Sequence, residues 1–173
     1  MIDLGGATIK VRQCHVIIVP LCVFLALGCV ATPAPSQAPL DTVRFVNPQT
    51  LAVPRGYSHV VEVPSGSRLL YVAGQVALDS AGRMVGPGDF RAQAVQVFEN
   101  LRRALAGADA TFKDVVKLNF YIVDATQIPT LREVRDRYVN TAAPPASTLV
   151  EVRRLFRDDV LLEVEAVAAV RHR

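Results

Sequence analysis

Cysteine, histidine and tryptophan are scarce in this sequence, and their scarcity excludes several kinds of chemistry. Of 173 residues, three are Cys, three are His and none is Trp. All three cysteines precede residue 30, so the rest of the chain offers no disulfide and no thiol nucleophile. No histidine stands with carboxylates at the spacing of a metal site. We therefore expect no bound metal ion.

Positive charge is present but weakly concentrated. The formal net charge is +3 and the isoelectric point is near 9.0. The arginines are scattered, without interleaved aromatic residues or a glycine-rich track. A solvated surface accounts for this pattern better than a nucleic-acid interface does. We expect no nucleic-acid partner.

The first 29 residues read as a signal peptide. Lys10 and Arg12 precede an apolar run over residues 16–28, which is shorter than the roughly 20 residues that a membrane-spanning helix needs. Gly28-Cys29 resembles a bacterial lipoprotein cleavage box, in which Cys29 would carry the lipid anchor. An ordinary cleaved signal or a short uncleaved anchor stays open beside it. A lipoprotein signal and an ordinary cleaved signal both predict export. We therefore expect a periplasmic protein, which lipidation would hold at the membrane.

A spacer separates this leader from the folded part. Residues 30–46 are rich in Pro and Ala and lack the apolar pattern of a core, which is typical of a semi-rigid tether. The sequence therefore predicts three parts: a signal peptide over 1–29, a tether over 30–46 and a folded domain over 47–173.

The first half of the domain shows strand patterns followed by a helix pattern. Residues 57–63 and 68–73 flank Pro64-Ser-Gly-Ser67, which predicts a hairpin, and residues 75–85 contain a second turn. Asp89 is placed to cap a helix that ends at Gly107. Its apolar positions recur every three or four residues and predict one buried stripe: Ala94, Phe98, Leu101 and Leu105.

The second half adds a strong strand, a helix and two more strands. Residues 115–123 alternate between apolar and polar, so one face of this strand should be buried. Thr130 is placed to cap the second helix, and strands are predicted over 147–152 and 161–170. The order ββ(β)αβαββ indicates an α+β fold with both helices on one face of the sheet. The uncovered face predicts self-association.

This order and a set of short motifs resemble the reactive-intermediate deaminase (Rid, or YjgF) family from Asn47 to Val170. The resemblance implies a chorismate-mutase-like fold, a homotrimer and small-molecule clefts at the subunit interfaces. Active members deaminate 2-imino or 2-enamino acids without a cofactor, which implies a hydrolase that acts on C–N bonds. The matching motifs are Arg55-Gly-Tyr57, Val72-Ala-Gly-Gln75, Asn100-Leu101, Asp114-Val-Val-Lys117, Tyr121-Ile-Val-Asp124, Pro145-Ala-Ser-Thr-Leu-Val-Glu-Val152 and Leu162-Glu-Val-Glu-Ala-Val-Ala168.

The chain departs from the family at one position of the site. Where active deaminases carry the arginine of a Pro-Ala-Arg-Ser stretch, this chain has Ser147. A guanidinium holds a carboxylate through two charge-assisted hydrogen bonds, whereas a serine offers one neutral bond. Hydrogen bonds to charged groups contribute about 1.5–3 kcal/mol, so the loss weakens the expected grip on a substrate carboxylate. We expect an altered specificity.

The resemblance assigns roles to further residues. Glu163 corresponds to the carboxylate that activates water, allowing one inserted residue within 156–159, and Tyr57 corresponds to a tyrosine that closes the cleft. Together with Ser147 these form the expected catalytic set. Asn119, Arg132 and Gly74 are the expected substrate-binding residues.

The residues themselves leave plainer interpretations open. Glu163 and Glu165 share a strand face, so both are also interpretable as solvated. If both enter one cleft, their repulsion should raise the pKa of one carboxyl group. Tyr57 is also interpretable as a packing residue, Asn119 as an amide bonded to a neighbour, and Ser147 as a small residue at a strand start. Arg132 either replaces the charge missing at position 147 or is a solvated helix residue.

Two functions therefore compete. One is an exported imine or enamine deaminase-type hydrolase of altered specificity, with Glu163, Ser147 and Tyr57 at its site. The alternative is a non-catalytic trimer of the cell envelope that binds a small molecule at its interfaces. The first predicts ammonia release that Glu163→Gln removes, and the second predicts stabilisation by a ligand without turnover.

Overall fold

A computed structural model describes residues 41–171 of the chain. The predicted signal peptide over 1–29, Cys29 and residues 30–40 of the tether lie outside the described residues. The first strand of the structure, β1, falls at residues 44–46, inside the range that the sequence assigns to the tether. Regular structure thus begins a few residues before the expected start of the domain.

The described residues form six strands and two α-helices. Their order, three strands followed by a helix, a strand, a helix and two strands, agrees with the predicted α+β order. The elements are β1 (Arg44–Val46), β2 (Val60–Glu62), β3 (Arg68–Gln75), α1 (Phe90–Gly107), β4 (Val115–Ile122), α2 (Ile128–Arg135), β5 (Ala146–Glu151) and β6 (Leu162–Val170).

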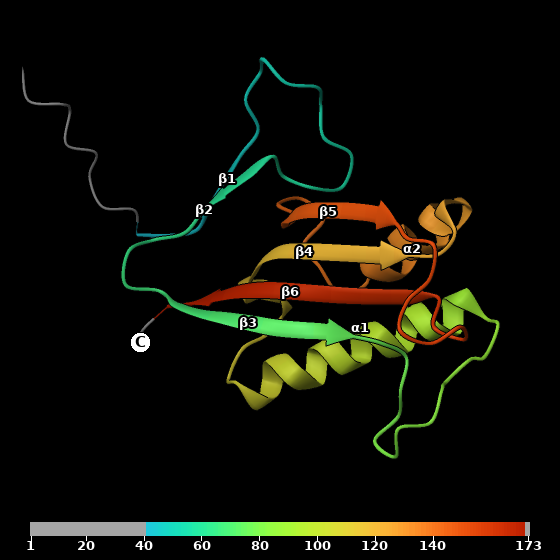
Figure 1. The fold of residues 1–173 in the computed structure, drawn as a ribbon. Coiled ribbons are helices and arrows are strands. Elements are labelled where there is room, and N and C mark those ends of the chain that lie inside the picture. The colour runs from blue at the N-terminus through green and yellow to red at the C-terminus, as the bar shows by residue number, and fades with distance from the viewer. Residues whose placement is uncertain (1–40, 172–173) are drawn as a thin grey trace, which may run out of the picture. The chain divides into compact units, whose positions relative to one another are not determined.

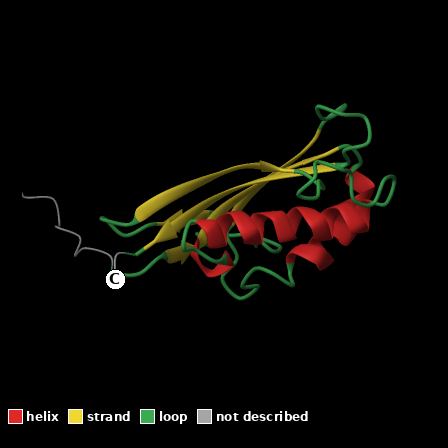
Figure 2. Cartoon of the chain, turned by 90° about the horizontal axis from the view of Figure 1, so that it is seen from below, coloured by secondary structure: helices red, strands yellow, loops and turns green. Residues whose placement is uncertain are grey.

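The central layer is a mixed four-stranded sheet. Its strands lie in the order β3-β6-β4-β5, antiparallel except for the parallel pair β4–β5 (Figure 1). Both helices cover one face of this sheet and leave the other face uncovered (Figure 2). This confirms the predicted placement of the helices.

The core lies between the helices and the sheet. The four predicted stripe residues of α1 are fully buried, as are the alternate apolar positions of β4, among them Leu118 and Ile122. Lys117, Asn119 and Tyr121 project from the opposite face of β4 and are partly exposed. Burial of apolar area is the main stabilising contribution here, at about 25 cal/mol per Å².

The two helices begin by different means. Asp89 caps α1 as predicted, because its carboxylate accepts a hydrogen bond from the Ala92 backbone N–H at 3.0 Å. The predicted cap of α2 at Thr130 is wrong, since α2 already begins at Ile128, directly after a 3-10 turn over Ala125–Gln127. Pro129 has no backbone N–H, and in the first helical turn such a group would have no partner within the helix. Proline therefore suits this earlier start.

The pairing of the first strands differs from the predicted hairpin. The turn at residues 64–67 is present, but β2 pairs with β1 and β3 pairs with β6. A turn signal fixes the local chain reversal, whereas strand pairing depends on distant partners. The expected short strands around residues 79–82 amount to a single bridge between Leu78 and Met84.

The uncovered face of the sheet carries large apolar side chains. Tyr71 is 79% exposed, and Leu69 and Val150 are also exposed. Self-association through this face stays a prediction. No helix within residues 41–171 has the length and apolar character needed to cross a bilayer.

Candidate functional site

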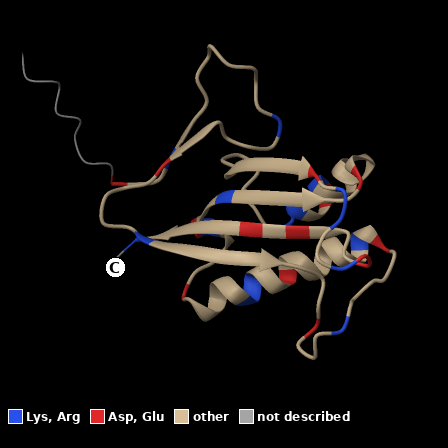
Figure 3. Cartoon of the chain, in the orientation of Figure 1, with Lys and Arg blue, Asp and Glu red and all other residues tan. Residues whose placement is uncertain are grey.

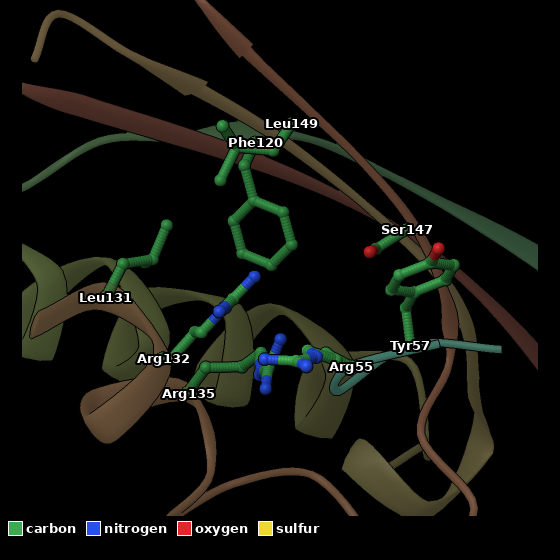
Figure 4. A pocket seen from close by; sticks show the side chains of 8 residues that line it. All are labelled: Arg55, Tyr57, Phe120, Leu131, Arg132, Arg135, Ser147 and Leu149. Atoms are coloured by element: carbon green, nitrogen blue, oxygen red, sulfur yellow. The ribbon is translucent and has the colours of Figure 1, made fainter. Parts of the chain in front are cut away.

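A small pocket of about 180 Å³ opens on the helix side of the sheet, near the β4–β5 edge (Figure 4). Its walls come from the segment before β2, from α2 and from the two parallel strands. The pocket is lined by Arg55, Tyr57, Phe120, Leu131, Arg132, Arg135, Ser147 and Leu149.

Backbone contacts to the start of β5 hold the segment that carries Tyr57. Ser58 is buried, its N–H donates to the Pro145 carbonyl at 3.2 Å, and its hydroxyl donates to the Pro144 carbonyl at 2.7 Å. A parallel bridge joins Ser58 to Ala146. Tyr57, the residue before Ser58, and Ser147, the residue after Ala146, both line the pocket (Figure 4).

Gly56 allows this segment to pass close to α2. Its φ is +79°, a conformation that side-chain-bearing residues rarely adopt, and an added Cβ would lie 2.5 Å from the Arg135 Nη2 atom. Arg135 is buried, with 8% of its surface exposed, and its guanidinium donates to the Asp136 carboxylate through Nε and Nη2 at 2.8 and 2.6 Å. Glycine thus lets the pocket segment pack against the buried guanidinium of Arg135.

The pocket carries an excess of positive charge. Arg55, Arg132 and Arg135 point into the same space in Figure 4, and Asp136 neutralises Arg135. Among residues 41–171, neither Arg55 nor Arg132 forms an ion pair, and both are exposed. Such an arrangement is suited to binding a small anion beside Ser147.

Sequence reasoning found part of this cationic set. It named Arg132 and missed Arg55 and Arg135. Arg132 and Arg135 stand three residues apart on α2, a spacing that places two side chains on one helix face and was a usable signal. Arg55 is brought in by the docking of an irregular segment, for which the sequence carries no periodic signal.

A second polar cluster lies on β3, β4 and β6, and the two acidic positions of β6 are visible in Figure 3. The Tyr121 hydroxyl and the Asn119 side-chain N–H₂ both donate to Glu165 Oε2 at 3.2 Å. Glu163 lies over Gly74, where an added Cβ would approach Glu163 Oε1 to 1.9 Å. The Asn119 amide is thus hydrogen-bonded to a neighbouring side chain, which is one of the two roles that the sequence left open for it.

The carboxyl group of Glu163 is perturbed in this cluster. Burial raises its pKa above the usual value of 4.5, and the nearby charge of Glu165 raises the pKa further. The expected repulsion between the two carboxylates is present, but burial is the larger cause. The pKa of Tyr121 is also raised, mainly because its hydroxyl donates to Glu165. Glu163 therefore holds a proton at a higher pH than an ordinary glutamate, which suits acid–base chemistry.

The two clusters lie on opposite faces of the same sheet. Phe120 pairs with Leu149 and both line the pocket, whereas the next residue of β4, Tyr121, pairs with Glu163. Successive residues of a strand point to opposite faces. Within one chain the structure thus brings together Tyr57, Arg132 and Ser147, and separately brings together Gly74, Asn119 and Glu163.

Replacing Gly74 by alanine tests the contact that positions Glu163. The new methyl group would occupy the space of the Glu163 carboxylate, so the carboxylate must move by more than an ångström. We expect any turnover that depends on Glu163 to fall by about 10- to 100-fold, with the fold retained. Gly107→Ala serves as a control, because an added Cβ there meets no atom within 4 Å, and equal rates in wild type and Gly74→Ala would contradict the positioning role.

Within residues 41–171, no three His, Cys, Asp or Glu side chains lie close enough together to hold a metal ion. The side chains of these two clusters offer carboxylates, a hydroxyl, two phenols, an amide and guanidinium groups.

A four-stranded mixed sheet covered on one face by two helices places the chain in the α+β class with a chorismate-mutase-like fold. Residues 48–170 match the family described as Endoribonuclease L-PSP. A RutC family protein of Pyrococcus abyssi is 36% identical over 112 residues, which cover 65% of this chain and 84% of the relative. The chain belongs to this family, which is also called the Rid or YjgF family.

Two further comparisons are informative. The 2-iminobutanoate/2-iminopropanoate deaminase of Mus musculus is 32% identical over 112 residues, covering 65% of this chain and 79% of the relative. The crystal structure of a conserved Rid-family protein from Yersinia pestis superposes with a TM-score of 0.66 at 34% identity, covering 75% of this chain and 99% of that chain. Some relatives of this chain are therefore imine deaminases.

Proposed function

We propose that this protein is a cofactor-free hydrolase that releases ammonia from a small 2-imino or 2-enamino acid, with a specificity altered by Ser147. The observation that carries the proposal is the position of Ser147 in a pocket that also contains Arg132. The cation that relatives place on the strand is supplied here from helix α2. The substrate carboxylate is then held by a guanidinium that approaches from a different direction.

The proposed reaction uses one water and no other reactant. Arg132 binds the substrate carboxylate, the Ser147 hydroxyl adds a hydrogen bond and Tyr57 closes the pocket. Glu163 takes a proton from water as the water oxygen bonds to the imine carbon, and passes the proton to the nitrogen. The resulting carbinolamine passes its hydroxyl proton to the nitrogen, again through Glu163, as the C–N bond breaks, which releases ammonia and leaves a 2-oxo acid. The raised pKa of Glu163 suits both the uptake and the return of this proton.

The proposed site is shared between copies of the chain. Glu163 faces away from the pocket of its own chain, so a complete site needs Glu163 from a neighbouring copy. The exposed apolar side chains around Tyr71 lie on the same sheet face as Glu163 and suit burial against another copy. We propose a homotrimer with its small-molecule sites at the subunit interfaces.

The direct test is ammonia release from imino acids that an amino-acid oxidase generates in the assay. We expect the protein to accelerate formation of the 2-oxo acid above the uncatalysed rate for at least one small imino acid. One observation favours the non-catalytic alternative, namely that no carboxylate is among the residues that line the pocket within residues 41–171 of a single chain. Ligand-induced stabilisation without acceleration of any imino acid would select that alternative.

We also propose export to the periplasm with lipidation of Cys29. The support is the charged and apolar leader that ends at Gly28-Cys29 and the Pro/Ala-rich segment after it. In a bacterial host, we expect the wild-type chain in the membrane fraction and Cys29→Ser in the soluble periplasmic fraction. Cys22→Ser is the matched control and should stay with the membrane. Retention of Cys29→Ser at the membrane would contradict lipidation, and a cytoplasmic wild-type chain would contradict export.

A further inference from the structure

Two arginines of the pocket have no assigned partner within the described chain. Arg55 comes from the segment docked on β5 and Arg132 from helix α2, so they approach the same pocket from different elements. The nearby helix-side arginines are neutralised. Arg135 pairs with Asp136, and Arg137 pairs with Glu133. Among residues 41–171, Arg55 and Arg132 are the pocket guanidiniums left without a carboxylate.

Clustering of unpaired cations favours the binding of anions. Guanidinium groups that share a pocket repel one another, and the repulsion is relieved when carboxylates bind. One carboxylate occupies one guanidinium fork through two parallel hydrogen bonds. A ligand with a single carboxylate would therefore pair with one of the two guanidinium groups and leave the other unpaired.

The remaining lining limits what joins the two anionic groups. Phe120, Leu131 and Leu149 give the pocket an apolar wall between strands and helix. The pocket volume of about 180 Å³ corresponds to about six water molecules at roughly 30 Å³ each. A short carbon chain with a carboxylate at each end matches this size and polarity.

We propose that the pocket selects a small dicarboxylate, with one carboxylate bound by Arg132 and the other by Arg55. This inference rests on the proposed function for the reacting group, and it names the substrate class as a 2-imino or 2-enamino dicarboxylic acid of about four or five carbons. Ser147 is a small residue of the pocket lining and leaves room for the second carboxylate.

Binding of matched four-carbon acids tests the proposal. Succinate and butyrate have equal chain length and differ in the second carboxylate, and calorimetry on the assembled protein in phosphate-free buffer measures both. We expect succinate to bind at least about tenfold more tightly than butyrate, the size of effect that one charge-assisted fork supplies. Equal affinities, no binding of either acid, or tighter binding of inorganic phosphate than of succinate would overturn the proposal.

Three variants assign the contacts. Arg55→Gln should reduce the affinity for succinate to that for butyrate and leave butyrate binding unchanged, whereas Arg132→Gln should weaken both. Arg153→Gln is the control for net charge, because Arg153 is an exposed residue outside the pocket, and it should change neither. Equal losses for both acids in Arg55→Gln would overturn the assignment. Thermal melting checks that each variant is folded. We expect all three to fold, because the substituted side chains are exposed.

The outcomes separate this inference from the proposed function. Succinate preference without any ammonia release would retain the ligand class and reject the hydrolase. Ammonia release from monocarboxylic imino acids, with no preference for succinate, would retain the hydrolase and reject the dicarboxylate.

Discussion

Glu163→Gln is expected to reduce ammonia release by about 100- to 10,000-fold, the usual contribution of a positioned general acid–base group. The amide keeps the size of the side chain and its place over Gly74, but it neither takes a proton from water nor returns one to nitrogen. In the proposed shared site Glu163 acts on water and does not contact the substrate carboxylate, so carboxylate affinity in the pocket should change less than turnover does. Steady-state rates and calorimetry on the same preparation measure the two effects separately.

Glu165→Gln is the matched control on the same strand face. It removes one of the two causes that raise the pKa of Glu163, the smaller one, and changes the acceptor used by Tyr121 and Asn119. The acidic limb of the pH–rate profile should therefore move to lower pH while turnover persists. If Glu165→Gln instead lost as much activity as Glu163→Gln, the catalytic carboxylate would have been assigned to the wrong residue.

The Glu163→Gln substitution also has a consequence for stability. The folded-state pKa of Glu163 lies above its unfolded value, so folding favours the protonated form. Its contribution to stability is present below the usual pKa near 4.5 and is lost as pH rises through the raised pKa. At neutral pH the ionised side chain opposes folding, so Glu163→Gln should be at least as stable as the wild type there. Activity and stability would then change in opposite directions.

The strongest periodic patterns predicted the fold. The alternation in β4 and the buried stripe of α1 gave correct elements, because burial against one layer imposes a period that the sequence displays. The partner of β2 was not predictable in the same way. Its pairing with β1 depends on residues 44–46, which stand at the end of a Pro/Ala-rich segment and have no pattern of their own.

The sequence named candidate site residues but not where the fold places them. The resemblance named Tyr57, Ser147 and Glu163 as one catalytic set, and nothing local in the sequence indicates that strand register places Glu163 on the other face. Arg55 enters the pocket through the hydrogen bonds of Ser58 and the positive φ of Gly56. These contacts join segments about ninety residues apart, beyond the reach of any periodic signal.

Serine at position 147 has a different meaning in the folded chain than in the sequence. In the sequence it stands where the resemblance implies an anion-binding arginine. In the structure, Ser147 faces a pocket whose cations come from α2 and from the docked segment. The proposed function therefore treats this position as part of a repositioned anion site, and the succinate and butyrate affinities test that proposal.

Mixed assemblies provide the sharpest test of a shared site. Glu163→Gln keeps an intact pocket, and Arg132→Gln keeps an intact Glu163, so each variant alone should be nearly inactive. In trimers assembled at random from equal amounts, a site is complete when its pocket comes from the first variant and its carboxylate from the second. About one quarter of all sites meet this condition, so activity should rise from near background to about one quarter of the wild-type value.

Refolding the two variants together gives the mixture for this measurement. With a different affinity tag on each variant the mixed trimers can then be isolated, and because each of them has one complete site in three, their activity should be about one third of the wild-type value. The control is the same mixture combined without refolding, which should stay inactive if subunits do not exchange. Rescue requires that Glu163 and Arg132 of one site belong to different chains, because a site built within one chain would carry one defect or the other in every copy. With an active wild type, purified mixed trimers that remain at background would therefore contradict the shared site.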